Sequence, residues 1–130
     1  MTTSAYLDAS AIVKLVVREP ESEALHRWYV EAQRLLTSRI GVVETLRASA
    51  RRPFDPAHRA RILTDLEVLE LSAEIAAVAA SLGGPALRTL DAIHIATAMA
   101  LGPDLDAFVT YDDRLAEAAR NLGLPVVRPA

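Results

Sequence analysis

The chain has 130 residues, 52% of them hydrophobic, and 17 acidic residues against 14 Lys and Arg give a net charge of −3. This length and composition fit one globular domain over residues 1–130, and the absence of cysteine excludes disulfides, thiol nucleophiles and thiolate metal sites. The charge argues against a basic coat for nucleic acid, and without a secretory leader or an apolar run of about 18 residues we expect a cytoplasmic protein with no membrane span.

Short apolar runs alternate with helical patterns along the whole chain. In chain order they predict a strand over residues 5–7, helices over 10–17 and 20–32, a strand over 35–37, helices over 38–50 and 56–65, a strand over 68–71, helices over 73–82 and 87–101, a strand over 107–110, a helix over 112–122 and a strand over 126–127. Ser10 and Ser38 are the predicted caps of the first and third helices. The Gly83-Gly84-Pro85 run predicts the end of the helix over residues 73–82.

Strands separated by helices predict an α/β fold. We expect one central, mostly parallel sheet of four or five strands with helices on both faces. In such sheets the functional site lies beyond the carboxyl ends of the strands. Asp104 and Asp106 precede the fourth strand and are therefore expected at the opposite edge.

Four acidic residues come from four separate segments at the expected functional edge. Asp8 follows the first strand and Asp112 follows the fourth. Glu44 lies about two turns into the helix after the second strand, and Asp91 lies one turn into an apolar helix. If they converge, their repulsion favours a hard cation such as Mg²⁺ or Mn²⁺, which oxygen ligands bind well.

Each acid also has a purely structural alternative. Asp8 and Asp112 could cap the helices that follow them. Glu44 could form an ion pair with Arg47, three residues further along the same helix. Asp91 could be a first-turn charge that favours the helix dipole. Local sequence alone leaves these alternatives open.

Three neighbouring polar residues could support such a site. His94 follows Asp91 by three residues on the same helix face, as a supporting group or as a satisfied, partly buried histidine. Ser10 and Thr110 lie near strand ends, where their hydroxyls could orient a water molecule or cap helices.

Four segments, taken in order, resemble a PIN-domain ribonuclease: YLDASAIVKL, VVE, LDAIHIATAMAL and FVTYDDRLAEAARNLGL. The best match is the VapC toxin group of bacterial VapBC toxin–antitoxin systems. The resemblance spans essentially the whole chain, although residues 53–85 match no motif. It implies a sheet flanked by helices, with the catalytic acids at Asp8, Glu44, Asp91 and Asp112.

The resemblance also implies further roles for single residues. The hydroxyl residue after the first acid falls on Ser10, and the one before the fourth falls on Thr110. Asp113 leaves the choice of the fourth acid open between itself and Asp112. Charge alone suggests a set of arginines for contacts with the RNA backbone: Arg47, Arg51, Arg52, Arg88 and Arg114.

The implied reaction is endonucleolytic cleavage of RNA. Asp8, Asp91 and Asp112 would bind Mg²⁺, with Mn²⁺ as a substitute, and Glu44 would help to hold metal or orient water. Metal-activated water would attack phosphorus and leave a 5′-phosphate and a 3′-hydroxyl.

The resemblance further implies a toxin homodimer and a small, VapB-like antitoxin that blocks the acidic site. The helix with Leu25, Trp28 and Tyr29 is a candidate lining for the antitoxin groove, and stability favours the alternative that the same stripe belongs to the core. In an alternative interpretation the chain has the same fold but no catalytic activity, and is a catalytically silent PIN-like module that binds a protein partner. A phosphoacceptor receiver domain would need a lysine beyond a late strand. That class is disfavoured because the only lysine is Lys14, near the start of the chain.

Overall fold

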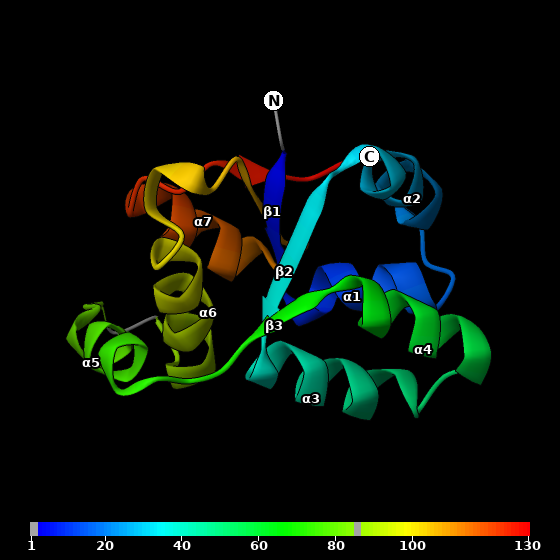
Figure 1. The fold of residues 1–130 in the computed structure, drawn as a ribbon, viewed down its shortest axis with the longest axis horizontal. Helices are drawn as coiled ribbons and strands as arrows, with labels where there is room; N and C mark the ends of the chain where they lie inside the picture. Colours follow the sequence, from blue (N-terminus) through cyan, green and yellow to red (C-terminus); the bar gives the residue numbers. More distant parts are fainter. Residues whose placement is uncertain (1–2, 85–86) are drawn as a thin grey trace.

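Five β-strands and seven α-helices follow one another in the described residues, 3–84 and 87–130, of this computed structural model (Figure 1). The strands are β1 (Ser4–Leu7), β2 (Arg34–Ser38), β3 (Glu67–Leu69), β4 (Ala107–Val109) and β5 (Val126–Val127). The helices are α1 (Ala9–Val16), α2 (Ser22–Glu31), α3 (Arg39–Ser49), α4 (Pro56–Asp65), α5 (Ala73–Ser81), α6 (Thr89–Met99) and α7 (Asp113–Asn121). The predicted helices and strands are confirmed, with ends shifted by a few residues. Pro85, part of the predicted helix-ending run, lies outside the described residues.

The strands form one sheet in the order β3-β2-β1-β4-β5, and every pair is parallel. β1 is central, with Tyr6 opposite Leu36 on one side and Phe108 on the other. The predicted parallel α/β fold is therefore confirmed. Because all strands run the same way, the segments after β1, β2 and β4 meet at one edge, where the acids are expected.

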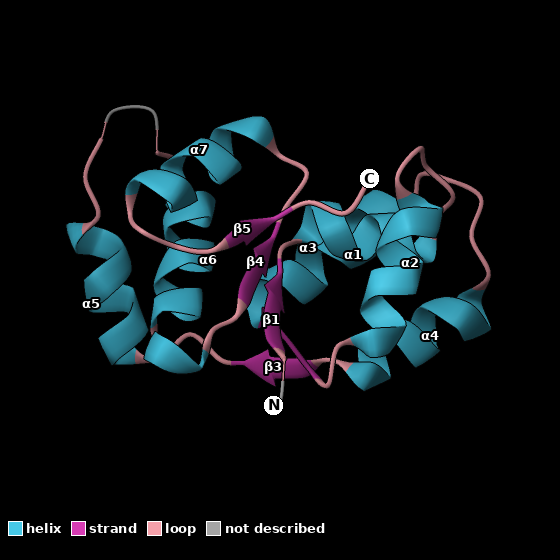
Figure 2. Cartoon of the chain, turned by 90° about the horizontal axis from the view of Figure 1, so that it is seen from above, coloured by secondary structure: helices cyan, strands magenta, loops and turns pink. Residues whose placement is uncertain are grey.

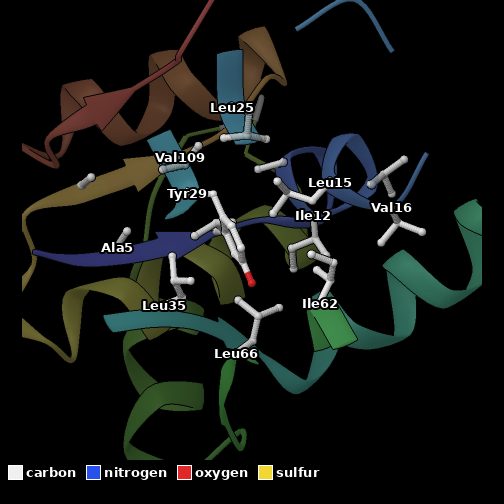
Figure 3. Close-up of a cluster of buried hydrophobic side chains, with 14 of the residues drawn as sticks. Ala5, Ile12, Leu15, Val16, Leu25, Tyr29, Leu35, Ile62, Leu66 and Val109 are labelled. Atoms are coloured by element: carbon white, nitrogen blue, oxygen red, sulfur yellow. The ribbon is translucent and has the colours of Figure 1, made fainter. Parts of the chain in front are cut away.

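Helices cover both faces of the sheet. In both ribbon views α1, α2 and α4 lie on one side, and α5, α6 and α7 lie on the other (Figures 1 and 2). Two clusters of buried hydrophobic side chains form the first and second cores of the protein. Alternate residues of β1 belong to different cores: Ala5 and Leu7 pack in the first, and Tyr6 packs in the second. The first core is drawn in Figure 3, where side chains of α1, α2 and α4 surround the strands.

Polar residues at the ends of β1 and β2 cap the helices that follow. Asp8, rather than Ser10, is the N-cap of α1 and accepts a hydrogen bond from the Ala11 N–H. The predicted Ser10 cap is therefore wrong, because the helix begins at Ala9 and takes Ser10 into its first turn. The Ser38 cap of α3 is confirmed by its bond to the Gly41 N–H.

The apolar stripe of α2 belongs to the core. Leu25 and Tyr29 are buried against α1 and the sheet, and Trp28 packs on the same cluster while remaining partly exposed (Figure 3 labels Leu25 and Tyr29). The idea that Leu25 and Tyr29 line an open groove is therefore wrong. Within the described residues, no helix is both long and apolar enough to cross a membrane.

Candidate active site

The four acidic residues come from the segments that leave the carboxyl ends of β1, β2 and β4 and from the first turn of α6. Asp8 directly follows β1, Glu44 lies in α3 after β2, and Asp112 precedes α7 after β4. Their positions in the topology are those that the sequence predicts.

Asp8 is buried, with 3% of its surface exposed, and both carboxylate oxygens accept hydrogen bonds. The Ser10 hydroxyl donates to Oδ1 at 2.6 Å and the Thr110 hydroxyl donates to Oδ2 at 2.7 Å. Burial raises the pKa of Asp8 above its ordinary value, and these two hydroxyls oppose part of that rise. The site therefore holds a carboxyl group whose ionisation is costly without a nearby cation.

Ser10 and Thr110 connect the ends of β1 and β4. Ser10 Oγ also accepts the Tyr111 N–H at 2.8 Å, and Thr110 Oγ1 accepts the Asp112 N–H at 3.1 Å. The two hydroxyls therefore fix both the Asp8 carboxylate and the backbone leading to Asp112.

Asp112 lies close enough to Asp91 for its charge to affect ionisation there. Desolvation by burial raises the pKa of Asp91 above its ordinary value, and the Asp112 charge raises it further. Asp112 Oδ1 also caps α7, accepting from the Arg114 and Leu115 N–H groups at 3.0 and 3.2 Å. Its capping role and its place beside Asp91 therefore coexist.

Asp113 points to a different partner. Its carboxylate lies 2.6 Å from Arg128 Nη1, and its side chain is 89% exposed. Arg128 also donates to the Thr110 carbonyl through Nε at 3.1 Å. Asp113 therefore ties the C-terminal segment to α7.

Glu44 is bonded across the fold rather than along its helix. Its Oε1 lies 2.6 Å from His94 Nε2, while His94 Nδ1 lies 2.7 Å from the Tyr6 hydroxyl. Within the described residues Glu44 has no ion pair with Arg47, so the local i+3 alternative is not realised. The sequence predicts Tyr6 only as part of a buried strand, and its bond to His94 has no local signal.

Gly41 is a second position that the sequence analysis does not connect with the site. A Cβ atom there would clash with Thr37 Oγ1 and would lie 3.4 Å from His94 Cε1. Glycine inside a helical pattern is the signal that could have pointed to this close approach.

A cavity of about 790 Å³ opens beside Glu44, between α1 and α3. Its lining includes Ser10, Tyr111 and three of the arginines suggested for RNA contacts, namely Arg47, Arg51 and Arg52. Arg52 is paired with Glu19 at 2.6 Å, whereas Arg47 and Arg51 form no ion pair with a described residue. The other two arginines lie nearer Asp91, where the Arg88 backbone donates a hydrogen bond and the Arg114 charge favours ionisation.

In residues 3–84 and 87–130 no three His, Asp or Glu side chains are grouped as a ready metal site. The carboxylates are instead satisfied by hydroxyl, backbone and imidazole donors. The donor set is nonetheless all oxygen, and two of its members repel each other, which suits a hard divalent cation.

Comparison with known proteins gives consistent matches. The PIN domain family model matches residues 5–121. Ribonuclease VapC46 of Mycobacterium tuberculosis is 44% identical over 127 residues, covering 96% of this chain and 97% of its own. This similarity extends over nearly the full length of both chains.

Solved structures share the fold at low sequence identity. The crystal structure of VapC20 from Mycobacterium tuberculosis, described as a sarcin-ricin loop cleaving toxin, is similar with a TM-score of 0.72 at 18% identity. It covers 97% of this chain and 100% of its own. The crystal structure of VapBC2 from Rickettsia felis, bound to a DNA fragment from its promoter, contains a similar chain with a TM-score of 0.66 at 13% identity. The match covers 98% of this chain and 100% of that chain.

Proposed function

Because this chain belongs to the PIN domain family and is similar along nearly its whole length to a VapC ribonuclease, we propose that it is a Mg²⁺-dependent endoribonuclease. It would act as the toxin of a type II toxin–antitoxin system. The observation that carries the proposal is the buried Asp8 carboxyl, held by the Ser10 and Thr110 hydroxyls. Thr110 also binds the Asp112 N–H, and the Asp112 charge acts on Asp91.

This arrangement is costly for a protein without a cation. The ionised, desolvated Asp8 carboxylate loses hydration that two hydroxyl bonds and the Ala11 N–H replace only in part. The Asp91 and Asp112 charges also repel each other. A divalent ion would offset both costs. We therefore assign Asp8, Asp91 and Asp112 as the residues that would hold Mg²⁺, with Mn²⁺ as a substitute. When bound, the ion would supply Lewis acidity and positive charge for hydrolysis of the phosphodiester by water.

The remaining residues have supporting roles in this proposal. Ser10 and Thr110 keep the two Asp8 oxygens in fixed directions. Glu44 provides a fourth carboxylate at the edge of the cavity, where it helps to hold the ion or orient water. Arg47 and Arg51 line the same cavity and would contact RNA phosphates. Asp113 is left out of the acid set because its carboxylate is turned to Arg128.

The proposed partners are RNA, a second copy of the chain and a small, VapB-like antitoxin that covers the acidic site. The similarity to a chain of the VapBC2 assembly supports the antitoxin. We place the complex in the cytoplasm, where RNA and the antitoxin would meet the toxin.

Purified wild type, Asp8→Asn and Asp113→Asn should be incubated with total bacterial RNA in Mg²⁺, in Mn²⁺ and in EDTA. We expect metal-dependent cleavage by the wild type and by Asp113→Asn. Asp8→Asn should lose about 100-fold or more, because it weakens binding of an ion that supplies several kcal/mol of transition-state stabilisation. Cleavage that persists in EDTA would contradict the metal assignment. Intact RNA with folded wild type in both metals would favour the silent binding module instead.

A further inference from the structure

His94 lies between two polar groups, Tyr6 from strand β1 and Glu44 from helix α3. It is 3% exposed in α6, with the Tyr6 hydroxyl 2.7 Å from Nδ1 and Glu44 Oε1 2.6 Å from Nε2. Both ring nitrogens are therefore bonded, and the plane of the imidazole is fixed from both sides. The Tyr6 ring also packs edge-on against the imidazole, with centroids 5.8 Å apart.

The direction of these two hydrogen bonds follows from the groups involved. An ionised carboxylate only accepts, so the His94 Nε2–H donates to Glu44. Burial raises the pKa of the Tyr6 phenol well above its usual value, so Tyr6 keeps its proton. The phenol hydrogen is therefore available to donate to Nδ1, which lies 2.7 Å from the Tyr6 oxygen. The expected tautomer of His94 thus carries its hydrogen on Nε2.

The packing around His94 is arranged to bring α3 close. Because Gly41 has no side chain, the first turn of α3 can lie against Thr37 and the imidazole. Glu44 follows three residues later on that helix and reaches the ring. The same helix offers Arg47 as a partner one turn on, yet the Glu44 carboxylate is held by His94 instead.

We propose that His94 is a positioning residue: the buried Tyr6–His94 pair holds the Glu44 carboxylate in a fixed direction at the edge of the active-site cavity. Glu44 is 33% exposed, so without this bond its long side chain would sample several rotamers. One oxygen is bound by His94, and the other remains for the ion or water that Glu44 serves. This inference rests on the proposed function, in which Glu44 is one of the catalytic acids.

Two substitutions at position 94 separate the two bonds. The amide nitrogen of His94→Gln can occupy the place of Nε2 and still donate to Glu44. The shorter His94→Asn places its amide near Nδ1, where it meets Tyr6 but does not reach Glu44. Melting temperatures of both variants control for folding.

We expect kcat for RNA cleavage to fall about 10- to 100-fold in His94→Asn, with KM changed less than twofold. His94→Gln should recover most of that loss. Because His94 acts through Glu44, the double variant His94→Asn/Glu44→Gln should be no slower than Glu44→Gln alone. Wild-type kcat in His94→Asn, or losses that multiply in the double variant, would overturn the proposal.

A second readout does not depend on activity. Two-bond ¹H–¹⁵N NMR spectra of the metal-free wild type should show the Nε2–H tautomer of His94, with ring signals that shift in Glu44→Gln and in Tyr6→Phe. An Nδ1–H tautomer, or signals indifferent to Glu44→Gln, would overturn the proposal even if His94→Asn does not fold. If the wild type cleaves no RNA, the proposed function fails, and this spectrum still decides whether His94 holds Glu44.

Discussion

Thr110 Oγ1 donates a 2.7 Å hydrogen bond to Asp8 Oδ2, and this bond joins the end of β4 to the end of β1 inside the protein. The acceptor is a carboxyl group with 3% exposure whose pKa is raised by burial. The bond therefore stabilises a charge that the fold itself disfavours. Such a group is expected where function, rather than stability, selects the residue.

Asp8→Asn should stabilise the metal-free fold at neutral pH by on the order of 1 kcal/mol or more, because it removes the cost of a buried charge. The folded-state pKa of Asp8 lies above the unfolded value of about 3.9. The stability that this group contributes is therefore fully present below the unfolded pKa and is lost as pH rises through the folded pKa. The advantage of Asp8→Asn should accordingly grow from acid to neutral pH.

Urea unfolding in EDTA between pH 4 and pH 8 measures this difference. Asp113→Asn is a suitable control, since its carboxylate is 89% exposed and should affect stability little at any pH. A variant at Asp8 that is less stable than the wild type at pH 7, by an amount independent of pH, would contradict the account.

Asp112 has two separable roles, and two substitutions divide them. Asn is as good an N-cap as Asp, so Asp112→Asn should keep the stability of α7, whereas Asp112→Ala should lose about 1 kcal/mol. Both variants should lose RNA cleavage, because both remove the carboxylate beside Asp91. Denaturant unfolding and cleavage assays on the same preparations test this, and wild-type cleavage by Asp112→Asn would refute the site assignment.

Gly41→Ala should destabilise the protein, although alanine is ordinarily favoured over glycine in a helix by about 1 kcal/mol. The new methyl group would meet Thr37 Oγ1, which is itself held by a 2.7 Å bond to the Leu7 carbonyl and cannot move freely. We expect a net loss of about 1–3 kcal/mol in chemical denaturation. Gly83→Ala is the control, because nothing lies within 4 Å of its Cβ position. A stabilised Gly41→Ala would show that α3 does not approach β2 this closely.

Thr45 is fully buried next to Glu44, and its hydroxyl has no hydrogen-bond partner within the described residues. Thr45→Val should therefore be neutral or stabilising by up to about 1 kcal/mol, since the new methyl group needs no partner. The matched control is Thr37→Val, which leaves the Leu7 carbonyl without its 2.7 Å bond and should cost about 1–3 kcal/mol. Equal losses at the two positions in thermal or urea unfolding would disprove this reading of Thr45.

The sheet and its helices were predictable because their signals are local. Apolar runs such as residues 5–7, glycine and proline breaks, and polar caps such as Ser38 act over a few residues, and the parallel order follows from the helical crossovers. The Ser10 cap failed for an equally local reason. Two polar residues stand close together at the start of α1, and Asp8, the earlier one, takes the capping position.

The internal bonding of the site was not predictable, because it joins residues far apart in sequence. Arg47 is the natural partner of Glu44 by helix spacing, yet the carboxylate is bonded to His94, 50 residues away. Tyr6 and His94 are 88 residues apart and meet only because β1 and α6 pack together in the second core. The hydrophobic periodicity of the sequence predicts that both residues are buried, but it does not predict which polar atoms form hydrogen bonds with each other.

The most direct test of the central claim is to map new RNA 5′-phosphate ends after separate induction of wild type and Asp8→Asn in a bacterial host. Both proteins should be folded and equally abundant, because the substitution is nearly isosteric. The account predicts sharp new ends with the wild type that are missing with Asp8→Asn. The same new ends from both proteins, or none from either, would contradict a metal-dependent ribonuclease centred on Asp8.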